Sequence, residues 1–443
     1  MSNTEITIIG GGLAGSEAAW QAARAGAKVL LYEMRPKVKT AVHQTGDLAE
    51  LVCSNSLKSN DLSKATGLLK HEMRRLDSLI IAAADSSAVP AGSALAVDRV
   101  KFAAAITQRL EEHVNITIVR DELQQIPKTP TIVATGPMTS PALAKSIQEI
   151  LGDSFLNFFD AVAPIVDADS LDYDRLFLAS RYDKGDAAYW NSPLTEAQYD
   201  VLREALLEAE ISVPHNPEDA EVPYFESCLP IEELARRGRL TMRFGALRGA
   251  GLTDPKTGRW PFACVQLRPE NQDGTMYNLV GFQTRLKWGD QTKILRLLPG
   301  LENVEIVRFG VIHKNIFLNA PSVLKSTFQT QSRADLFFAG QLTGVEGYVE
   351  SSAAGLLAGM NAARFVADKS TLTLPRETAL GALTHYMTTA DPAHYQPMNS
   401  NWALLPPLPP PPNKKKWGKD EKAQLLVQRA QSAMDEFLTT IDR

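Results

Sequence analysis

Three cysteines are the most reactive side chains of this 443-residue sequence, and they are Cys53, Cys228 and Cys264. They lie far apart and form no Cys-x-x-Cys, so they indicate neither a disulfide framework nor a zinc site. A thiolate can add to an electron-poor carbon and later leave it. The polar segment 50–59 favours a reactive thiol and a small buried side chain equally at Cys53, whereas the residues around Cys228 favour a structural role. The apolar run 260–265 predicts that Cys264 lies in a core.

A glycine-rich turn near the start of the chain is a second site of possible chemistry. Gly10-x-Gly12-x-x-Gly15 follows a β-branched run at 6–9 and opens an Ala- and Leu-rich segment from 13 to 24. A second predicted strand, 28–33, ends at Glu33, about 20 residues on, as in the dinucleotide-binding fingerprint. Such a turn brings backbone N–H groups to a pyrophosphate, and Glu33 can accept hydrogen bonds from ribose hydroxyls. The predicted cofactor-binding residues of this unit are Gly10, Gly11, Gly12, Leu13, Ala14, Gly15 and Glu33.

The elements that position these residues repeat later in the chain. Runs at 116–119 and 131–136 predict further strands of one sheet. A strand at 335–340, a turn through Gly344 and Gly347, and a helix at 351–365 repeat the N-terminal pattern. The fingerprint alone does not separate NAD from FAD, but a second helix N-terminus near the pocket favours FAD.

A change in composition predicts two domains. Residues 165–325 lose the Ala-rich, Gly-punctuated pattern and gain aromatic, Asp, Arg and Pro residues. We therefore expect an α/β protein, with a Rossmann-like FAD-binding domain of the glutathione-reductase type formed by 1–164 and 326–443, and an inserted α+β domain at 165–325. The proline run 406–412 predicts an extended spacer before a last helix near 419–440.

Charge and hydropathy narrow the class of protein. The formal net charge of −5 argues against a protein that coats nucleic acid non-specifically, although it leaves room for a local basic face. The sequence has no run of about 20 apolar residues that could span a membrane. We expect a soluble, cytoplasmic protein that needs no metal and no membrane.

Several segments together resemble the folate- and FAD-dependent tRNA (uracil-5-)-methyltransferases (TrmFO), which are related to the larger GidA/MnmG flavoproteins. The similar segments run through most of the chain, and the Cys53 and Cys228 segments are the most specific to the family. They are 10–17, 32–36, 50–59, 159–166, 180–185, 225–232, 280–284, 309–315 and 338–352.

The resemblance implies a reaction and its participants. 5,10-Methylenetetrahydrofolate supplies a carbon to the T-loop uridine of tRNA, and FAD, reduced by NADPH or NADH, supplies electrons. Cys228 would add to C6 of uracil and Cys53 would take the C5 proton, although the two roles could be reversed. Further cofactor-binding residues would be Arg35, Thr135, Gly136, Gly340, Gln341, Gly347, Tyr348, Glu350 and Ser351.

The resemblance also implies the substrate contacts. His313, which as a single histidine after an apolar run favours a structural role, would stack on the pterin ring of the folate. The arginines after Cys228 indicate a solvated face or a phosphate-binding patch equally, and the tRNA substrate favours the patch. The predicted substrate-binding arginines are Arg236, Arg237 and Arg239, with Arg243 and Arg248 in the same patch. The family often has a further cysteine where this chain has Asn191-Ser192-Pro193, so that position is expected to have no chemical role here.

Three other functions remain open from the sequence. A flavin oxidoreductase acting on a small molecule needs the same dinucleotide fold but no tRNA. A tRNA-binding module could keep FAD only as a structural ligand. A GidA-like enzyme would modify the wobble uridine, but this chain is too short for the extra C-terminal domain of that relative.

Overall fold

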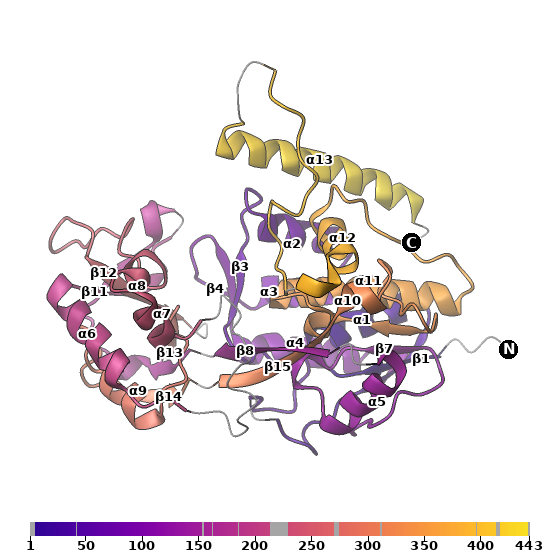
Figure 1. Ribbon diagram of the computed structural model, residues 1–443, viewed down its shortest axis with the longest axis horizontal. Helices are drawn as coiled ribbons and strands as arrows, with labels where there is room; N and C mark the ends of the chain where they lie inside the picture. The colour runs from indigo at the N-terminus through magenta and orange to yellow at the C-terminus, as the bar shows by residue number, and fades with distance from the viewer. Residues whose placement is uncertain are drawn as a thin grey trace.

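The computed structural model describes residues 5–40, 42–152, 155–161, 163–184, 186–212, 229–269, 274–310, 312–395, 397–412 and 417–441. Two lobes lie side by side, and the long helix α13 (Lys419–Thr440) lies across the larger one (Figure 1). No helix in the described ranges is long and apolar enough to cross a membrane.

The larger lobe is built on a parallel five-stranded sheet with the order β16-β7-β1-β2-β6. The strands β1, β7 and β16 are buried on both faces, whereas β2 and β6 are partly exposed. The strand order reverses at β1, so a crevice opens between β1 and β7 at the carboxyl ends of the strands. The strand bounds are β1 Glu5–Ile9, β2 Lys28–Tyr32, β6 Ile116–Val119, β7 Thr131–Val133 and β16 Leu336–Phe338.

Two helices cross closely over this sheet, α1 (Leu13–Arg24) and α11 (Tyr348–Val366). Their crossing depends on small residues, because a Cβ on Gly355 would lie 2.1 Å from the carbonyl oxygen of Ala14. Gly359 meets Ala18 in the same way, at 2.4 Å. The close crossing brings the N-termini of both helices to the same crevice.

Two of the remaining helices of the larger lobe are held at their N-termini by the buried carboxyl groups of Glu17 and Glu72. Glu17 accepts hydrogen bonds from Ser78 and Ile80 at the start of α3, and Glu72 accepts from Ala379 and Leu380 at the start of α12. Such caps satisfy first-turn N–H groups that have no partner inside their own helix. The other elements here are α2 Ala65–Arg75, α3 Leu79–Ser86, α4 Arg99–Glu111, α5 Pro141–Leu151, α10 Ala320–Val323 and α12 Ala379–Thr389, with the small sheet β3 Ser56–Ser59, β5 Ala94–Val97 and β4 Ala88–Val89.

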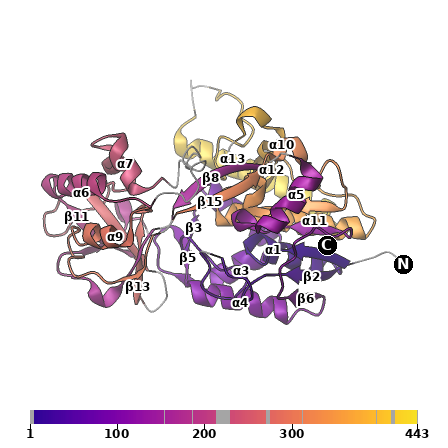
Figure 2. The same ribbon diagram turned by 60° about the horizontal axis from the view of Figure 1, so that its bottom comes forward.

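The smaller lobe is an antiparallel six-stranded sheet with the order β10-β11-β12-β13-β9-β14. Its helices are α6 Glu196–Glu208, α7 Ile231–Arg237, α8 Thr241–Phe244 and α9 Trp288–Leu295. A two-stranded ribbon, β8 (Phe155–Ala161) paired with β15 (Ile312–Leu318), runs between the lobes (Figure 2). The strand bounds are β9 Ile165–Asp167, β10 Phe177–Ala179, β11 Tyr189–Leu194, β12 Ala263–Pro269, β13 Met276–Val280 and β14 Ile306–Arg308.

The predicted fold class is confirmed, with a parallel α/β lobe and an α+β insertion. The second glycine turn leads into α11, which begins at Tyr348, three residues before the predicted start. Gly347, with φ +118°, ends the loop there and lets the helix begin earlier. The core of the smaller lobe ends at Ile306, whereas residues 317–324 already pack into the core of the larger lobe.

Candidate active site

In the first glycine turn, Gly10 and Gly15 are closely packed against backbone atoms, whereas Gly12 faces open space. A Cβ on Gly10, whose φ is +100°, would lie 2.7 Å from the carbonyl oxygen of Ala134, and a Cβ on Gly15 would lie 1.8 Å from that of Gly10. A Cβ on Gly12 would meet no protein atom within 4 Å. The turn therefore needs Gly10 and Gly15 for its own packing, while Gly12 leaves space for another molecule.

That space belongs to a cavity of about 1100 Å³ at the switch point of the sheet, which we call the dinucleotide pocket. Both glycine turns and the N-termini of α1 and α11 reach it, so the first-turn N–H groups of two helices point toward one pocket. Of the predicted residues, those that line it are Gly10, Gly12, Leu13, Ala14, Glu33, Arg35, Thr135, Gly136, Gly340, Gln341, Tyr348 and Ser351.

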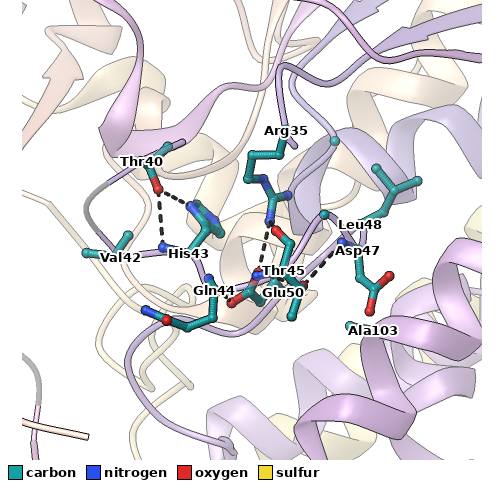
Figure 3. Close-up of polar contacts among 12 residues, drawn as sticks. Arg35, Thr40, Val42, His43, Gln44, Thr45, Asp47, Leu48, Glu50 and Ala103 are labelled. Carbon is teal, nitrogen blue, oxygen red and sulfur yellow. Dashed lines mark hydrogen bonds and ion pairs between the residues drawn. The ribbon is translucent and has the colours of Figure 1, made fainter. Parts of the chain in front are cut away.

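A buried ionic network closes one wall of the pocket. The carboxylate of Glu33 accepts from the backbone N–H of Gly11 at 3.0 Å and from Nε of Arg35 at 2.9 Å. Arg35 also donates to Glu50 at 3.0 Å, and Figure 3 shows this pair beside the loop that contains Thr45. Burial alone would raise the pKa of Glu33, but hydrogen bonding to Arg35 and its charge outweigh burial and lower the pKa.

The same loop holds a histidine that the sequence analysis did not single out. His43 lines the dinucleotide pocket, and its Nδ1 lies 2.6 Å from the hydroxyl of Thr40. Burial, followed by the positive charge of Arg35, lowers the pKa of His43 to about 4. The imidazole is therefore neutral at neutral pH, and its other ring nitrogen can donate or accept a hydrogen bond.

A second cavity of about 1290 Å³ lies where the lobes meet, and we call it the thiol cavity. Val52, Pro137, Gln341 and Tyr348 line both cavities, so the two adjoin. The larger lobe contributes Cys53, Gly347 and Glu350 among others, and the smaller lobe contributes residues of β12, β13 and the turn after β13. A molecule in the dinucleotide pocket could thus extend toward a cysteine.

Cys53 is half-buried, and its backbone is held from both sides. Its N–H and that of Ser54 both donate to the hydroxyl oxygen of Tyr348, at 2.6 and 3.1 Å. The guanidinium of Arg99 donates to the carbonyl oxygens of Leu51 and Cys53. Burial, with the neighbouring Cys53, raises the pKa of Tyr348, so its hydroxyl stays protonated.

The smaller lobe reaches the Cys53 segment through Arg268, a buried residue of β12. Arg268 donates to Ser54 Oγ at 2.6 Å and to Asn55 Oδ1 at 2.8 Å, and it lies 3.5 Å from Asn278 Oδ1. Asn55 in turn donates to the carbonyl oxygen of Pro269 at 2.6 Å. These bonds fix the two residues after Cys53 against the other lobe and place a permanent positive charge at the thiol cavity.

Lys58 and Glu350 form another part of the wall of the thiol cavity. Lys58 Nζ lies 3.4 Å from Oε1 of the fully buried Glu350, which also accepts from the N–H of Ser400. Oε2 of Glu350 has no hydrogen-bond partner among the described residues and lies close to Gly347. The side chains of Glu350 and Lys58 therefore add one charge of each sign to this wall.

Cys228 lies outside the described residues. The chain that follows it is hydrogen-bonded to a wall residue of the thiol cavity. The N–H of Ile231 donates to the carbonyl oxygen of Gln283, a wall residue. The buried carboxylate of Glu232 accepts from Thr284 Oγ1 and from the N–H of Arg285, both at 2.8 Å. Residues 231–232 are thus anchored to the turn after β13.

The remaining predicted residues lie in three different settings. Cys264 is fully buried, as predicted, and burial raises the pKa of its thiol to about 12. His313 lies in β15, where its backbone is paired with that of Asp160 in β8. Arg236 pairs with Glu233 at 3.5 Å, and Arg239 pairs with Glu196 and Asp200, both at 2.7 Å, while Arg237 ends α7. Within the described ranges, no group of three or more His, Cys, Asp or Glu residues could hold a metal ion.

The parallel sheet with a glycine turn at its switch point, joined to an antiparallel second lobe, defines a two-lobed dinucleotide-binding class of protein. The family model described as "Glucose inhibited division protein A" matches residues 5–370. Among solved structures, GidA of Aquifex aeolicus is similar in fold, with a TM-score of 0.70 at 18% identity over 98% of this chain and 73% of that chain.

Similarity in sequence is much closer to another set of proteins. The chain is 55% identical over 437 residues to the methylenetetrahydrofolate–tRNA-(uracil-5-)-methyltransferase TrmFO of an Exiguobacterium species, covering 99% of both chains. It is 54% identical to that of Bacillus subtilis, over 98% of this chain and 99% of the relative. The chain belongs to the TrmFO family, within the wider family of glucose inhibited division protein A.

Proposed function

We propose that this protein methylates C5 of the T-loop uridine of tRNA, taking the carbon from 5,10-methylenetetrahydrofolate and electrons from FAD that NADPH or NADH has reduced. The observation that carries the proposal is the 55% identity, over 99% of both chains, to a protein named for this folate-dependent reaction. The adjoining dinucleotide pocket and thiol cavity support it, because the reaction needs a nucleotide cofactor beside a nucleophilic side chain.

The residues of the dinucleotide pocket fit FAD. The open space beside Gly12 allows a pyrophosphate to approach the turn, where helix N–H groups favour a negative charge. Glu33, which lines this pocket, would accept hydrogen bonds from ribose hydroxyls, and its contact with Arg35 lowers the pKa of its carboxyl group. The N-terminus of α11, with Gly347, Tyr348, Glu350 and Ser351, would hold the end of the cofactor that faces the thiol cavity. FAD supplies the two electrons that convert a transferred methylene group into a methyl group.

The two cysteines would divide the remaining chemistry. The thiolate of Cys228 forms a bond to C6 of uracil, and the electron pair of the C5–C6 double bond moves into an enolate, so that C5 can attack the folate carbon. Cys53 takes the proton that C5 then loses as the bond between the methylene carbon and the folate nitrogen breaks, which releases tetrahydrofolate and leaves an exocyclic methylene group on C5. The hydride equivalent that reduced FAD would supply makes this group a methyl and returns an electron pair to the ring, and departure of the Cys228 sulfur as a thiolate restores the C5–C6 double bond. Arg268 and Arg99 hold the Cys53 segment in place.

The substrate contacts that the resemblance implies are part of the same proposal. His313 would stack on the pterin ring. Arg236, Arg237 and Arg239 would contact tRNA phosphates, and for Arg236 and Arg239 this requires an exchange of their carboxylate partners. Phosphate contacts must offset the cost of taking the uridine out of its stack.

Capture of an RNA that carries 5-fluorouridine in the T-loop tests the proposal. Fluorine at C5 cannot leave as a proton does, so the thiol adduct persists and migrates as a protein–RNA band on a denaturing gel. We expect the band in the wild type and in Cys264→Ala, whose thiol is buried, and its loss in Cys228→Ala. A band that follows Cys53 instead would reverse the two roles.

Capture also separates the other functions. An oxidoreductase acting on a small molecule would oxidise NADPH and capture no RNA. A tRNA-binding module with structural FAD would bind tRNA without oxidising NADPH. A wobble-uridine enzyme would capture an RNA that carries 5-fluorouridine at the wobble position and not one that carries it in the T-loop.

A further inference from the structure

The smaller lobe carries an exposed strip of aromatic and arginine side chains that the proposed chemistry does not use. Phe244 is 68% exposed, Trp260 56% and Tyr182 48%, which is unusual for side chains of this size. Arg243 and Arg248 lie among them. We call these five residues the aromatic strip.

Two sets of direct contacts order the side chains of the strip, one among Tyr182, Arg248 and Trp260 and one between Arg243 and Phe244. A guanidinium nitrogen of Arg248 donates to the hydroxyl of Tyr182 at 3.2 Å. The rings of Tyr182 and Trp260 meet edge to face, with centroids 6.2 Å apart. The guanidinium of Arg243 lies 5.0 Å from the ring centroid of Phe244, as a cation–π pair. The aromatic faces are thus fixed before any partner arrives, which lowers the entropy cost of binding.

The chain segment that carries part of the strip packs against the wall of the thiol cavity. Ala246 lies in the chain between Phe244 and Arg248, and a Cβ on Gly281 would lie 3.0 Å from the Cβ of Ala246. Gly281 is itself a wall residue of that cavity. A polymer whose one unit enters the cavity can therefore lie along the strip with its neighbouring units.

The charge of the strip favours an anionic partner. Among the described residues, neither Arg243 nor Arg248 has a carboxylate within salt-bridge distance, whereas Arg239 has two. The formal net charge of the chain is −5, so this uncompensated positive charge is a local feature. Exposed aromatic rings beside uncompensated arginines are the combination that binds unstacked bases and their phosphates.

We propose that the aromatic strip binds the opened loop of the tRNA substrate, with bases next to the target uridine stacked on Tyr182, Phe244 and Trp260 and with phosphates on Arg243 and Arg248. This inference rests on the proposed function and adds the surface that holds the RNA. The main RNA contact is then the aromatic strip and not Arg236 and Arg239, whose charges are offset by carboxylates.

The test is tRNA binding by the full-length protein across a salt series, with an unmodified tRNA transcript. Trp260→Ala should weaken binding roughly 5- to 150-fold, the value of one base–aromatic stack. Arg248→Gln should reduce the slope of log K against log salt by about 1. Trp288→Ala is the matched control, because Trp288 is 63% exposed on α9, outside the strip, and it should bind as the wild type does.

The outcomes separate the strip from the proposed function. Flavin content and NADPH oxidation without tRNA should be unchanged in all three variants. If the wild type methylates tRNA and Trp260→Ala binds tRNA as tightly as the wild type does, the RNA-binding role of the strip is refuted and the proposed function is retained. If Trp260→Ala instead changes only the oligomeric state, the strip is a protein interface and the inference is overturned. A wild type that does not bind tRNA overturns both.

Discussion

Replacing Gly12 with alanine tests the dinucleotide pocket, because the added methyl group meets no protein atom within 4 Å. The backbone of Gly12, with φ −73° and ψ −168°, is extended, and alanine adopts this conformation without strain. The protein without flavin should therefore be at least as stable as the wild type, with a gain of up to about 1 kcal/mol from the less flexible unfolded chain.

Bound FAD changes this balance. If the pyrophosphate lies against the turn, as we propose, the methyl group occupies the space that the cofactor needs. Overpacking of this size costs about 1–3 kcal/mol, which corresponds to FAD binding about 5- to 150-fold weaker. The stabilisation that added FAD gives to the folded protein should fall by the same amount.

The assay is thermal unfolding with and without FAD, together with the flavin absorbance of the purified protein. Two further alanine variants serve as controls, one for a disrupted turn and one for a glycine outside the pocket. Gly15→Ala should unfold readily even without FAD, because its Cβ would lie 1.8 Å from a backbone oxygen. Gly289→Ala, in open space on α9, should gain up to about 1 kcal/mol in stability as Gly12→Ala does, but should keep the flavin content and the FAD-induced stabilisation of the wild type. Normal flavin content in Gly12→Ala would refute the placement of FAD at this turn.

Three further predictions concern buried groups. Arg268→Ala leaves Asn55 Oδ1 without its donor, while Ser54 Oγ keeps the N–H of Ser56, so we expect a loss of about 1–3 kcal/mol in the free energy of unfolding and a methylation rate lowered at least tenfold, measured by chemical denaturation and by turnover. A rate equal to that of the wild type would contradict a positioning role. Burial raises the pKa of Glu72 to about 8, so the stability that its protonated form provides is present in full below pH 4.5 and is lost as pH rises toward 8. The stability of the wild type relative to Glu72→Gln should therefore fall by at least about 1.4 kcal/mol, or one pKa unit, over that range, and a flat difference would show that the carboxyl is not so perturbed. Cys264→Ala should keep near-normal activity at a cost of about 1 kcal/mol in stability, since its thiol is buried away from both cavities, and complete loss of turnover would show this to be wrong.

The sequence was sufficient for the parts of the fold that depend on local patterns. Residues 5–24 form a strand, a glycine turn and a helix, and residues 336–366 repeat this order. Both units could be predicted from a short apolar strand pattern followed by closely spaced glycines. The last helix, Lys419–Thr440, follows from its amphipathic pattern after a proline run. Each of these signals lies within about 30 residues of chain.

The walls of the cavities could not be predicted in this way. Arg268 and Asn55 are 213 residues apart in sequence, and Lys58 and Glu350 are 292 apart. An arginine inside an apolar strand gives no local sign that it will cross to another lobe. His43 is likewise a single histidine in a polar loop, and its pKa is lowered by burial and then by the charge of Arg35, neither of which the local sequence shows.

The central claim is that the protein transfers a folate carbon to tRNA with the use of Cys228. The most direct test is incubation with NADPH, 5,10-methylenetetrahydrofolate labelled in its methylene carbon and an unmodified tRNA transcript, followed by nucleoside analysis. We predict labelled 5-methyluridine at the T-loop in the wild type and in Cys264→Ala, and none in Cys228→Ala. Oxidation of NADPH by the wild type with no labelled 5-methyluridine would contradict the account.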